Sequence, residues 1–488
     1  MKSFLLAFSL TLAPTTAQQL WVTYAGGSGP GAGRHVVLVS GDEEYRSEEA
    51  LPALGKILAT RHGFRCTVLF AIDPATGQIQ PNNRFNIPGL EALASADVMV
   101  IATRFRDLAD DQMALIDAYL LRGGPVLGMR TATHAFNIPK NKPYGRYGNG
   151  FNGEPAEWQG GFGRLVLGEM WISHHGHHGQ ESTGGLIAPG ARDHVLTRGL
   201  QDRDVWGPTD VYGVRLPLPG DSEPIVLGQV LAGMTPDAAP VEGKKNDPIL
   251  PVAWTKTYQL PGGKPGRTFA TTMGASTDLE SAGTRRMLVN AVYWLAGLGE
   301  AIPAEGTDAT LVGEYAPSKF AFHKDEHWVE KAMTPAHFAL PAAGEFATLD
   351  DTIGALYACI SGPVGAPRDF DRMRRLFAPE ARLIPSGPRR DGSHAHSLIS
   401  VDDYIARSGD QLESMGFRET EIARRVDRFG NIAQVFSTYE AWRGEETKPF
   451  MRGINSIQAV FDGKRWWILN VFWQQESAAT PIPAEYLK

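Results

Sequence analysis

The first 300 residues alternate short apolar runs with amphipathic segments of helical period. Residues 47–62 and 110–121 carry apolar side chains three and four positions apart, which predicts two helices. The apolar runs have the length of buried strands, and they cover residues 35–40, 65–70, 97–102 and 125–129. Strands that alternate with helices in this way are typical of a doubly wound, flavodoxin-like α/β domain.

The predicted α/β domain extends over residues 34–302. Residues 165–172 and 267–272 predict two further strands, and 281–298 predict a helix. Residues 303–345 are rich in Pro and Ala and show no clear period, so we interpret them as a tail and linker.

The pattern changes over residues 346–476. Helical periods come first, and three runs of alternating polar and apolar residues follow at 419–428, 433–442 and 454–461. Asp462-Gly463-Lys464 predicts a hairpin turn before the last run, 465–475. Helices followed by a curved antiparallel sheet predict a separate, cone-shaped α+β domain.

Composition limits the classes of function. A length of 488 residues allows two or three domains, and a net charge of -7 without a basic stripe argues against a nucleic-acid partner. Residues 1–17 have a charged start, an apolar run and small residues at the end, which predicts a signal peptide and export to the periplasm or the outside. No later run is long enough to span a bilayer. The two cysteines, Cys66 and Cys359, lie far apart and favour buried free thiols.

Polar side chains follow the ends of the predicted parallel strands. Right-handed crossovers place these strand ends on one edge of the sheet, where α/β proteins bind ligands. The residues gathered there are Asp42, Glu43, Glu44, Arg104, Arg106, Arg130, Thr131, Thr133 and His134. The sequence therefore predicts a polar ligand site at this edge.

The corner formed by residues 128–136 has the strand-turn-helix form that presents a nucleophile in many α/β enzymes. It contains no Cys or Ser, so the expected nucleophile is absent. His134 is the first choice for an acid or base at this corner. The alternative is that His134 only forms a hydrogen bond with the backbone at a helix N-terminus.

Five motifs carry a family resemblance: residues 41–52, 104–106, 130–136, 174–179 and 274–276. Together they resemble the ThuA-like (trehalose-utilisation-like) family. The resemblance implies a fold similar to class I glutamine amidotransferases and a role in sugar utilisation. Because the amidotransferase cysteine has no counterpart at the corner, glutaminase activity is not expected.

Residues 346–476 resemble SnoaL-like, nuclear-transport-factor-two-like domains, in which helices and a curved sheet enclose a pocket. The features are the helical start, the stretch 376–381 and the final hairpin through Trp466-Trp467-Ile468. Candidate pocket residues are Tyr357, His394, His396, Tyr404, Tyr439, Arg452 and Trp473. A ketosteroid-isomerase-like site would need a carboxylate against apolar walls, and the sequence singles out none.

Three groups at the predicted edge have two interpretations each. Glu43 or Glu44 would act as a general base, with Asp42 holding sugar hydroxyls, or the acidic excess simply suits a helix dipole. The arginines would clamp an anionic or carbonyl ligand, or they pair with the acidic loop. Trp171 would offer an apolar face to a sugar ring, or it packs in the core.

A cluster of histidines follows the last of these residues: His174, His175, His177 and His178. Neutral imidazoles at such spacings can converge on one divalent metal ion, with Glu169 or Glu181 nearby. The alternatives are a polar loop that binds the sugar and a purely structural loop. No cofactor is fixed by the sequence, and a divalent metal is one interpretation.

The leading hypothesis is an exported protein that binds, and as a hydrolase or isomerase transforms, a saccharide or oxidised sugar through acid-base or metal-assisted chemistry. One alternative is a non-catalytic carbohydrate-binding protein whose C-terminal domain forms a homodimer. In another alternative the SnoaL-like domain is the catalytic part.

Overall fold

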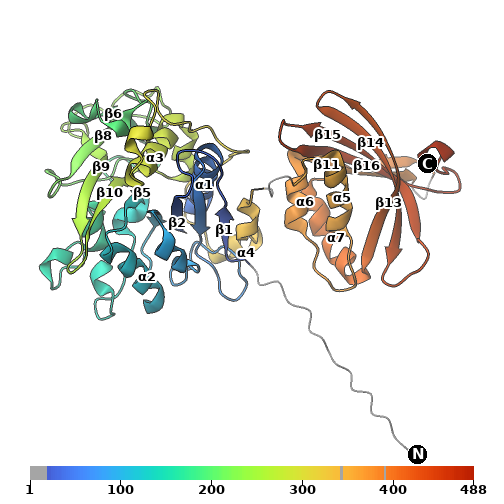
Figure 1. Ribbon diagram of the computed structural model, residues 1–488, viewed down its shortest axis with the longest axis horizontal. Coiled ribbons are helices and arrows are strands. Elements are labelled where there is room, and N and C mark those ends of the chain that lie inside the picture. Colours follow the sequence, from blue (N-terminus) through green and yellow to red (C-terminus); the bar gives the residue numbers. More distant parts are fainter. Residues whose placement is uncertain (1–18, 341–344, 389–391, 488) are drawn as a thin grey trace, which may run out of the picture. The chain divides into compact units, whose positions relative to one another are not determined.

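The computed structural model describes residues 19–340, 345–388 and 392–487. They form two compact units, and the chain passes from the first to the second between Ala339 and Leu340 (Figure 1). The first unit contains a ten-stranded sheet and the second a six-stranded sheet. The signal peptide predicted at residues 1–17 lies outside the described residues.

Five parallel strands make the centre of the first sheet. Numbered along the chain as first to fifth, β2, β3, β4, β5 and β10 lie in the order 2-1-3-4-5 across the sheet. β1 pairs antiparallel with β3, and β9, β8, β6 and β7 continue antiparallel beyond β10. The strands are β1 (Trp21–Tyr24), β2 (His35–Gly41), β3 (Arg65–Leu69), β4 (Val98–Thr103), β5 (Val126–Met129), β6 (Ser182–Ile187), β7 (Trp206–Gly207), β8 (Glu223–Leu231), β9 (Leu250–Gln259) and β10 (Pro265–Thr271).

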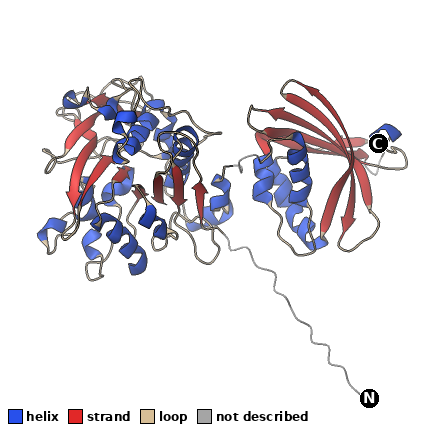
Figure 2. Ribbon diagram, viewed as in Figure 1, coloured by secondary structure: helices blue, strands red, loops and turns tan. Residues whose placement is uncertain are grey.

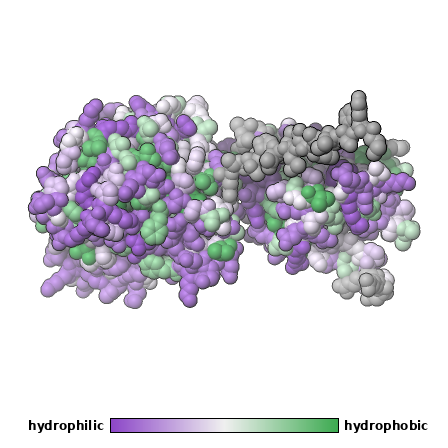
Figure 3. Space-filling model, turned by 90° about the horizontal axis from the view of Figure 1, so that it is seen from below, coloured by the Kyte–Doolittle hydropathy of each residue, from purple (hydrophilic) through white to green (hydrophobic). Residues whose placement is uncertain are grey.

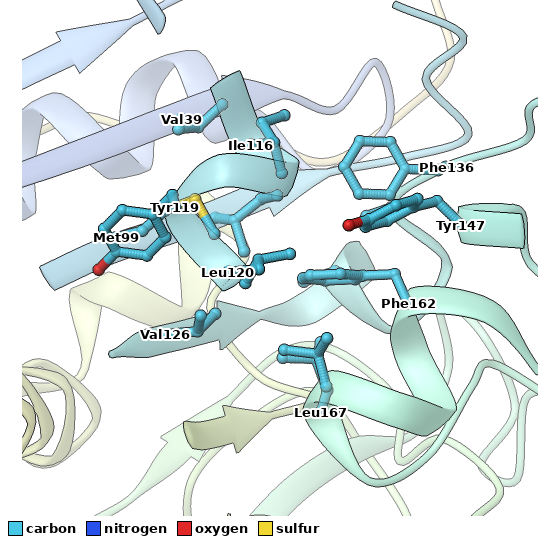
Figure 4. Close-up of a cluster of buried hydrophobic side chains, with 14 of the residues drawn as sticks. Val39, Met99, Ile116, Tyr119, Leu120, Val126, Phe136, Tyr147, Phe162 and Leu167 are labelled. Atoms are coloured by element: carbon cyan, nitrogen blue, oxygen red, sulfur yellow. The ribbon is translucent and has the colours of Figure 1, made fainter. Parts of the chain in front are cut away.

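Helices cover both faces of these parallel strands. α1 (Ser47–His62) packs so closely on β3 that a Cβ added to Gly55 would lie 3.3 Å from Cγ2 of Val68. α3 (Ala282–Leu295) contacts α1 and β5. α2 (Asp110–Leu121) packs on the opposite face, in an apolar cluster that Figure 4 shows around Ile116, Tyr119 and Leu120. The predicted mixed α/β class is confirmed for the first unit.

Residues 165–172, expected as a strand, contain none. A π-helical turn covers Gly163–Leu167, and the Leu167 carbonyl accepts a hydrogen bond from Trp254 Nε1 at 2.6 Å. The Leu167 side chain lies on β5, where a Cβ added to Gly128 would be 2.7 Å from it. The start of the run, with Val166 and Leu167, is therefore buried on the face of the sheet instead of pairing at its edge.

Residues 303–339, expected as a tail and linker, pack within the first unit. α4 (Asp325–Lys331) places Trp328 in a fully buried position, where its ring lies 4.6 Å from the Arg46 guanidinium. Arg46 also donates a hydrogen bond to the Ala321 carbonyl at 2.8 Å. Because single anchors rather than a periodic apolar face hold this segment, its sequence shows no regular pattern.

The helices of the second unit lie on one face of a curved sheet (Figure 2). The strand order is β12-β11-β16-β15-β14-β13, antiparallel except for the pair β11 and β16. The three alternating runs form β13, β14 and β15, so the predicted α+β arrangement agrees with the structure. The elements are α5 (Leu349–Ile360), α6 (Phe370–Leu376), β11 (Phe377–Pro388), β12 (His394–His396), α7 (Val401–Met415), β13 (Phe417–Phe429), β14 (Ile432–Arg443), β15 (Met451–Phe461) and β16 (Trp466–Gln475).

Surface and burial add three facts. Cys66 and Cys359 are buried free thiols, each in the core of its own unit. Within the described ranges, no helix combines the length and apolar character needed to cross a bilayer. The face of the first unit drawn in Figure 3 is mostly hydrophilic, with apolar side chains in small separate patches.

Replacing Trp328 with Ala should release residues 303–339 from the first unit, because the largest buried side chain of this segment is lost. The expected loss in docking free energy is about 3 kcal/mol or more. Limited proteolysis of the full-length chain, with cleavage sites mapped by mass spectrometry, should show faster cutting inside this segment. Val329→Ala is the matched control because Val329 is 62% exposed. Equal cleavage of the wild type and W328A would contradict the packing of this segment.

Candidate functional site

Arg130 lies at the centre of the sheet edge predicted as a ligand site. It follows β5 with a positive φ of 44°, a strained conformation for a residue with a Cβ. Its guanidinium donates to Oδ1 of Asp210 at 2.9 Å and to the Tyr45 hydroxyl at 3.0 Å. The rings of Tyr45 and Tyr212 lie on its two faces, with centroids at 4.3 and 4.0 Å. Arg130 is therefore a fully buried structural cation and not a free ligand clamp.

Asp42 shapes the turn between β2 and α1. Its Oδ2 accepts a hydrogen bond from Thr131 Oγ1 at 2.7 Å, and its Oδ1 accepts from the backbone N–H groups of Glu44 and Tyr45 at 2.8 and 3.1 Å. Only 1% of Asp42 is exposed. Asp42 and Thr131 thus hold each other and leave little surface for a ligand.

Glu43 pairs with both arginines that follow β4, Arg104 and Arg106. Arg106 is fully buried and also donates to three backbone carbonyls. Arg104 approaches Glu44 as well, with Nε 3.3 Å from Oε2. Burial raises the pKa of Glu44, and the neighbouring Asp42 carboxylate adds to this rise. Arg104 and Arg106 thus pair with the acidic loop, as one of the two interpretations expects, whereas Arg130 pairs with Asp210 outside that loop.

His134 is buried between the rings of Phe105 and Trp171, whose centroids lie at 4.9 and 5.4 Å. Its Nδ1 contacts Thr133 Oγ1 at 3.2 Å. Burial holds the pKa of His134 well below its ordinary value, and nearby arginines lower it further. A neutral imidazole at this position can accept or donate a hydrogen bond, but it is a weak base near neutral pH.

The structure divides the histidine cluster. His174 and His178 converge on Asp210, with Nδ1 atoms 2.7 and 3.2 Å from its two carboxylate oxygens. His175 instead contacts the Lys245 carbonyl at 2.8 Å. His177 is exposed, and its backbone N–H donates to Glu181 Oε2 at 2.6 Å. Burial alone would raise the pKa of Asp210, but Arg130 and the two imidazoles hold it well below its ordinary value.

Neither acidic residue considered as a partner of this cluster joins it. Glu169 pairs with Arg164 and Arg215, and Glu181 pairs with Lys245. The carboxylate that does join, Asp210, lies 32 positions after His178 in a stretch without periodicity. Sequence spacing alone offers no signal for it.

A second candidate site lies inside the C-terminal unit, where a cavity of about 310 Å³ opens between the helices and the sheet. Its wall is mostly apolar, as in typical small-molecule sites. The apolar and aromatic lining residues are Leu356, Ile360, Met373, Leu383, Tyr404, Leu412, Met415, Phe417, Tyr439, Phe450, Met451, Val471 and Trp473. The polar ones are Ser408, Gln411, Glu419, Arg443 and Asn455.

Glu419 is the only acidic residue among the described residues that line this cavity. Its side chain is buried, and Oε1 accepts a hydrogen bond from Asn455 Nδ2 at 3.2 Å. The same amide donates to the Tyr357 hydroxyl at 3.1 Å. Burial raises the pKa of Glu419 to about 7, although the Asn455 hydrogen bond opposes the rise. A carboxyl group with this pKa against apolar walls can take up or release a proton near neutral pH.

Three of the seven candidate pocket residues, Tyr404, Tyr439 and Trp473, line the cavity. Tyr357 lies behind Asn455, whereas Arg452 pairs with Glu476 outside the lining. His394 and His396 form the short edge strand β12 and are exposed. The sequence does hold a signal for the missed Glu419, because it shares the inward positions of β13 with Phe417.

Comparison with known proteins finds no family model that matches the chain. No curated protein matches it either. The comparisons give no support for the ThuA-like resemblance of residues 34–302, which stays a prediction.

Several solved structures are similar to part of the chain. An NTF2-like protein of unknown function from Silicibacter pomeroyi is 17% identical over 28% of this chain and 100% of its own, with a TM-score of 0.21. A protein of unknown function with a cystatin-like fold from Nostoc punctiforme is 9% identical over 27% and 90%, with a TM-score of 0.22. An NTF2-like protein from Shewanella baltica is 10% identical over 28% and 99%, with a TM-score of 0.19. Likeness of this extent says nothing about what this chain binds.

The raised pKa of Glu419 makes stability depend on pH. The carboxyl pKa is 4.5 without the fold and about 7 within it, so the folded state binds the proton more tightly. This contribution is complete below pH 4.5 and is lost as pH rises through 7. Relative to the wild type, Glu419→Gln should therefore gain about 3 kcal/mol in unfolding free energy between pH 4.5 and pH 8.

Calorimetry of the full-length chain at several pH values measures this difference. Glu421→Gln is the control, because Glu421 lies two residues further along β13 and pairs with Arg424 instead of lining the cavity. A difference between the wild type and E419Q that stays constant with pH would contradict the raised pKa.

Proposed function

We propose that the second unit is an acid-base enzyme site for a small, largely apolar molecule with an acidic C–H bond beside a carbonyl or a similar group. The observation that carries this proposal is the Glu419 carboxyl group in an apolar cavity. Near its pKa of about 7 the group is partly ionised at neutral pH, and this is the range in which a general base works best. The reaction class is proton abstraction and return, as in an isomerase.

The neighbouring residues suit this role. Asn455 donates a hydrogen bond to Oε1 of Glu419. Among the described residues Oε2 has no hydrogen-bond partner, so this oxygen is the one that would accept the substrate proton. Apolar walls exclude water and strengthen the charge that develops during transfer. Arg443, whose guanidinium stacks 3.8 Å from the Phe450 ring centroid, is the cation of the lining and would attract an anionic end of the substrate.

The test uses 5-nitrobenzisoxazole, a flat aromatic probe whose ring opens when a base removes one C–H proton, releasing a coloured phenolate. We expect the full-length chain to accelerate this opening and its rate to rise with pH through about 7, since only the ionised Glu419 is a base. Glu419→Gln should lower the rate by about 100-fold or more.

Glu421→Gln is again the matched control and should keep the rate within about 3-fold of wild type, because general-base catalysis needs a carboxylate in contact with the probe. Equal rates for the wild type and E419Q, or no rate above buffer for either protein, would reject this function.

A second function is proposed for the first unit: binding of a saccharide or oxidised sugar at the sheet edge of an exported, ThuA-like protein. The strand order 2-1-3-4-5 is that of flavodoxin-like sheets, which bind ligands at the carboxyl ends of their strands, and it supports this proposal. Half-exposed His178 lies 3.6 Å from Glu44 Oε1, next to the Phe320 ring, and offers polar and apolar contacts together. Export and a homodimer formed through the second unit remain parts of this proposal.

Calorimetric titration with trehalose and with gluconate tests the sugar site, because these probes represent a neutral sugar and an oxidised one. We expect one of them to bind, and Glu44→Gln to weaken it by about 10-fold through loss of a charged hydrogen-bond acceptor. Glu157→Gln, a change at an exposed glutamate, is the control. Binding of neither probe, or equal binding by E44Q, would count against this site.

A further inference from the structure

We propose that His174, His178 and Asp210 form a binding site for one divalent transition-metal ion of the Zn²⁺ or Co²⁺ type. The site lies at the sheet edge of the first unit and is independent of the acid-base function proposed for the second. Candidate ligand atoms of the three residues all lie within 4.8 Å of one another.

The distances suit a small ion. The two Nδ1 atoms lie 2.7 and 3.2 Å from the carboxylate oxygens of Asp210, and the two imidazole centroids are 4.8 Å apart. Ligands about 2.0–2.2 Å from a tetrahedral Zn²⁺ are themselves about 3.3 Å apart. Small side-chain movements would therefore bring three donor atoms into coordination.

The backbone holds this arrangement in place. His174 forms an isolated β-bridge with Tyr212, and the N–H groups of His175 and Gly176 both donate to the Val211 carbonyl, at 2.9 and 3.1 Å. A Cβ added to Gly176 would lie 3.2 Å from Cβ of Asp210, so glycine allows the loop to approach this carboxylate closely. The histidine loop and the Asp210 segment are thus fixed side by side before any ion binds.

Charge and exposure indicate the kind of site. Asp210 is completely buried, while the side chains of His174 and His178 are 39% and 37% exposed. The ion would therefore have protein ligands on one side and solvent on the other, as in catalytic zinc sites that keep a position for water or substrate. Arg130 contacts Oδ1 of the Asp210 carboxylate. Glu44, close to His178, adds a second negative charge beside the site.

Two imidazole ligands select the class of ion. Imidazole suits Zn²⁺, Co²⁺, Ni²⁺ and Cu²⁺, whereas Mg²⁺ and Ca²⁺ take oxygen ligands. The imidazole Nδ1 atoms, which face the Asp210 carboxylate, are the ones that would reach the ion.

The test is a Co²⁺ titration of full-length chain that carries no histidine tag and has been treated with a chelator. Visible absorption reports cobalt bound by nitrogen ligands, and elemental analysis after desalting gives the stoichiometry. We expect one equivalent, displaced by Zn²⁺ and not by Mg²⁺. The double variant H174A/H178A should lose at least 100-fold in affinity, because two of three protein ligands are gone.

Two matched variants sharpen the result. His177→Ala removes an exposed histidine of the same loop and should leave the affinity unchanged. His323 and His327 stack with ring centroids 3.9 Å apart and are the rival pair, so H323A/H327A should also bind one equivalent. Circular dichroism in chelator should show that H174A/H178A keeps the fold, and the single variants H174A and H178A, at half-exposed side chains, supply further loss variants if it does not. The proposal would be overturned if the wild type bound less than half an equivalent of Co²⁺. It would also be overturned if the variants that alter the site bound Co²⁺ as tightly as the wild type, or if only H323A/H327A lost binding.

Discussion

The edge of the first unit depends on one buried ion pair, between Arg130 and Asp210. Removing these charges from water costs several kcal/mol for each ion, and such pairs persist only where further hydrogen bonds satisfy both partners. The two terminal nitrogens of Arg130 meet this condition by donating to two backbone carbonyls and to the Tyr45 hydroxyl, and two aromatic rings pack against the guanidinium. Its Nε has no hydrogen-bond partner among the described residues. The pair ties the strained corner after β5 to the segment that carries Asp210, and through Asp210 to both converging histidines.

The two candidate sites shift the pKa of a buried carboxyl group in opposite directions. At the sheet edge, Asp210 is surrounded by cationic and donor groups, so it stays ionised in spite of complete burial. In the second unit, Glu419 has one amide donor and apolar walls, and burial raises its pKa. The first environment suits a fixed ligand or orienting group, and the second suits a group that changes its protonation state.

Local pattern predicted the parallel centre of the first sheet and the helix-then-sheet order of the second unit, but not the antiparallel strands β1 and β6 to β9. β2 to β4, α1 and α2 begin and end within about one residue of the predicted positions. The spacing of apolar residues identifies buried strands and amphipathic helices directly in the sequence. The strand predicted at residues 165–172 is absent. An apolar run alone cannot distinguish a strand that pairs at the sheet edge from a segment that packs on the face of the sheet. For the edge residues, topology correctly brought Glu43, Arg104 and His134 together. It could not show that Asp210 joins His174 and His178, since that contact depends on tertiary structure.

The packing of residues 303–339 on the first unit affects where the chain can be divided. Phe320 lies on the rings of Tyr45 and His178, and the Ala321 N–H donates to the Glu44 carbonyl at 3.1 Å. A fragment that ends at residue 302 would keep every strand of the first unit but lose the side chains that pack on Tyr45 and His178 at the candidate site. The natural point of separation is therefore near Ala339, and an α/β unit cut there would keep all the residues that pack around the candidate site.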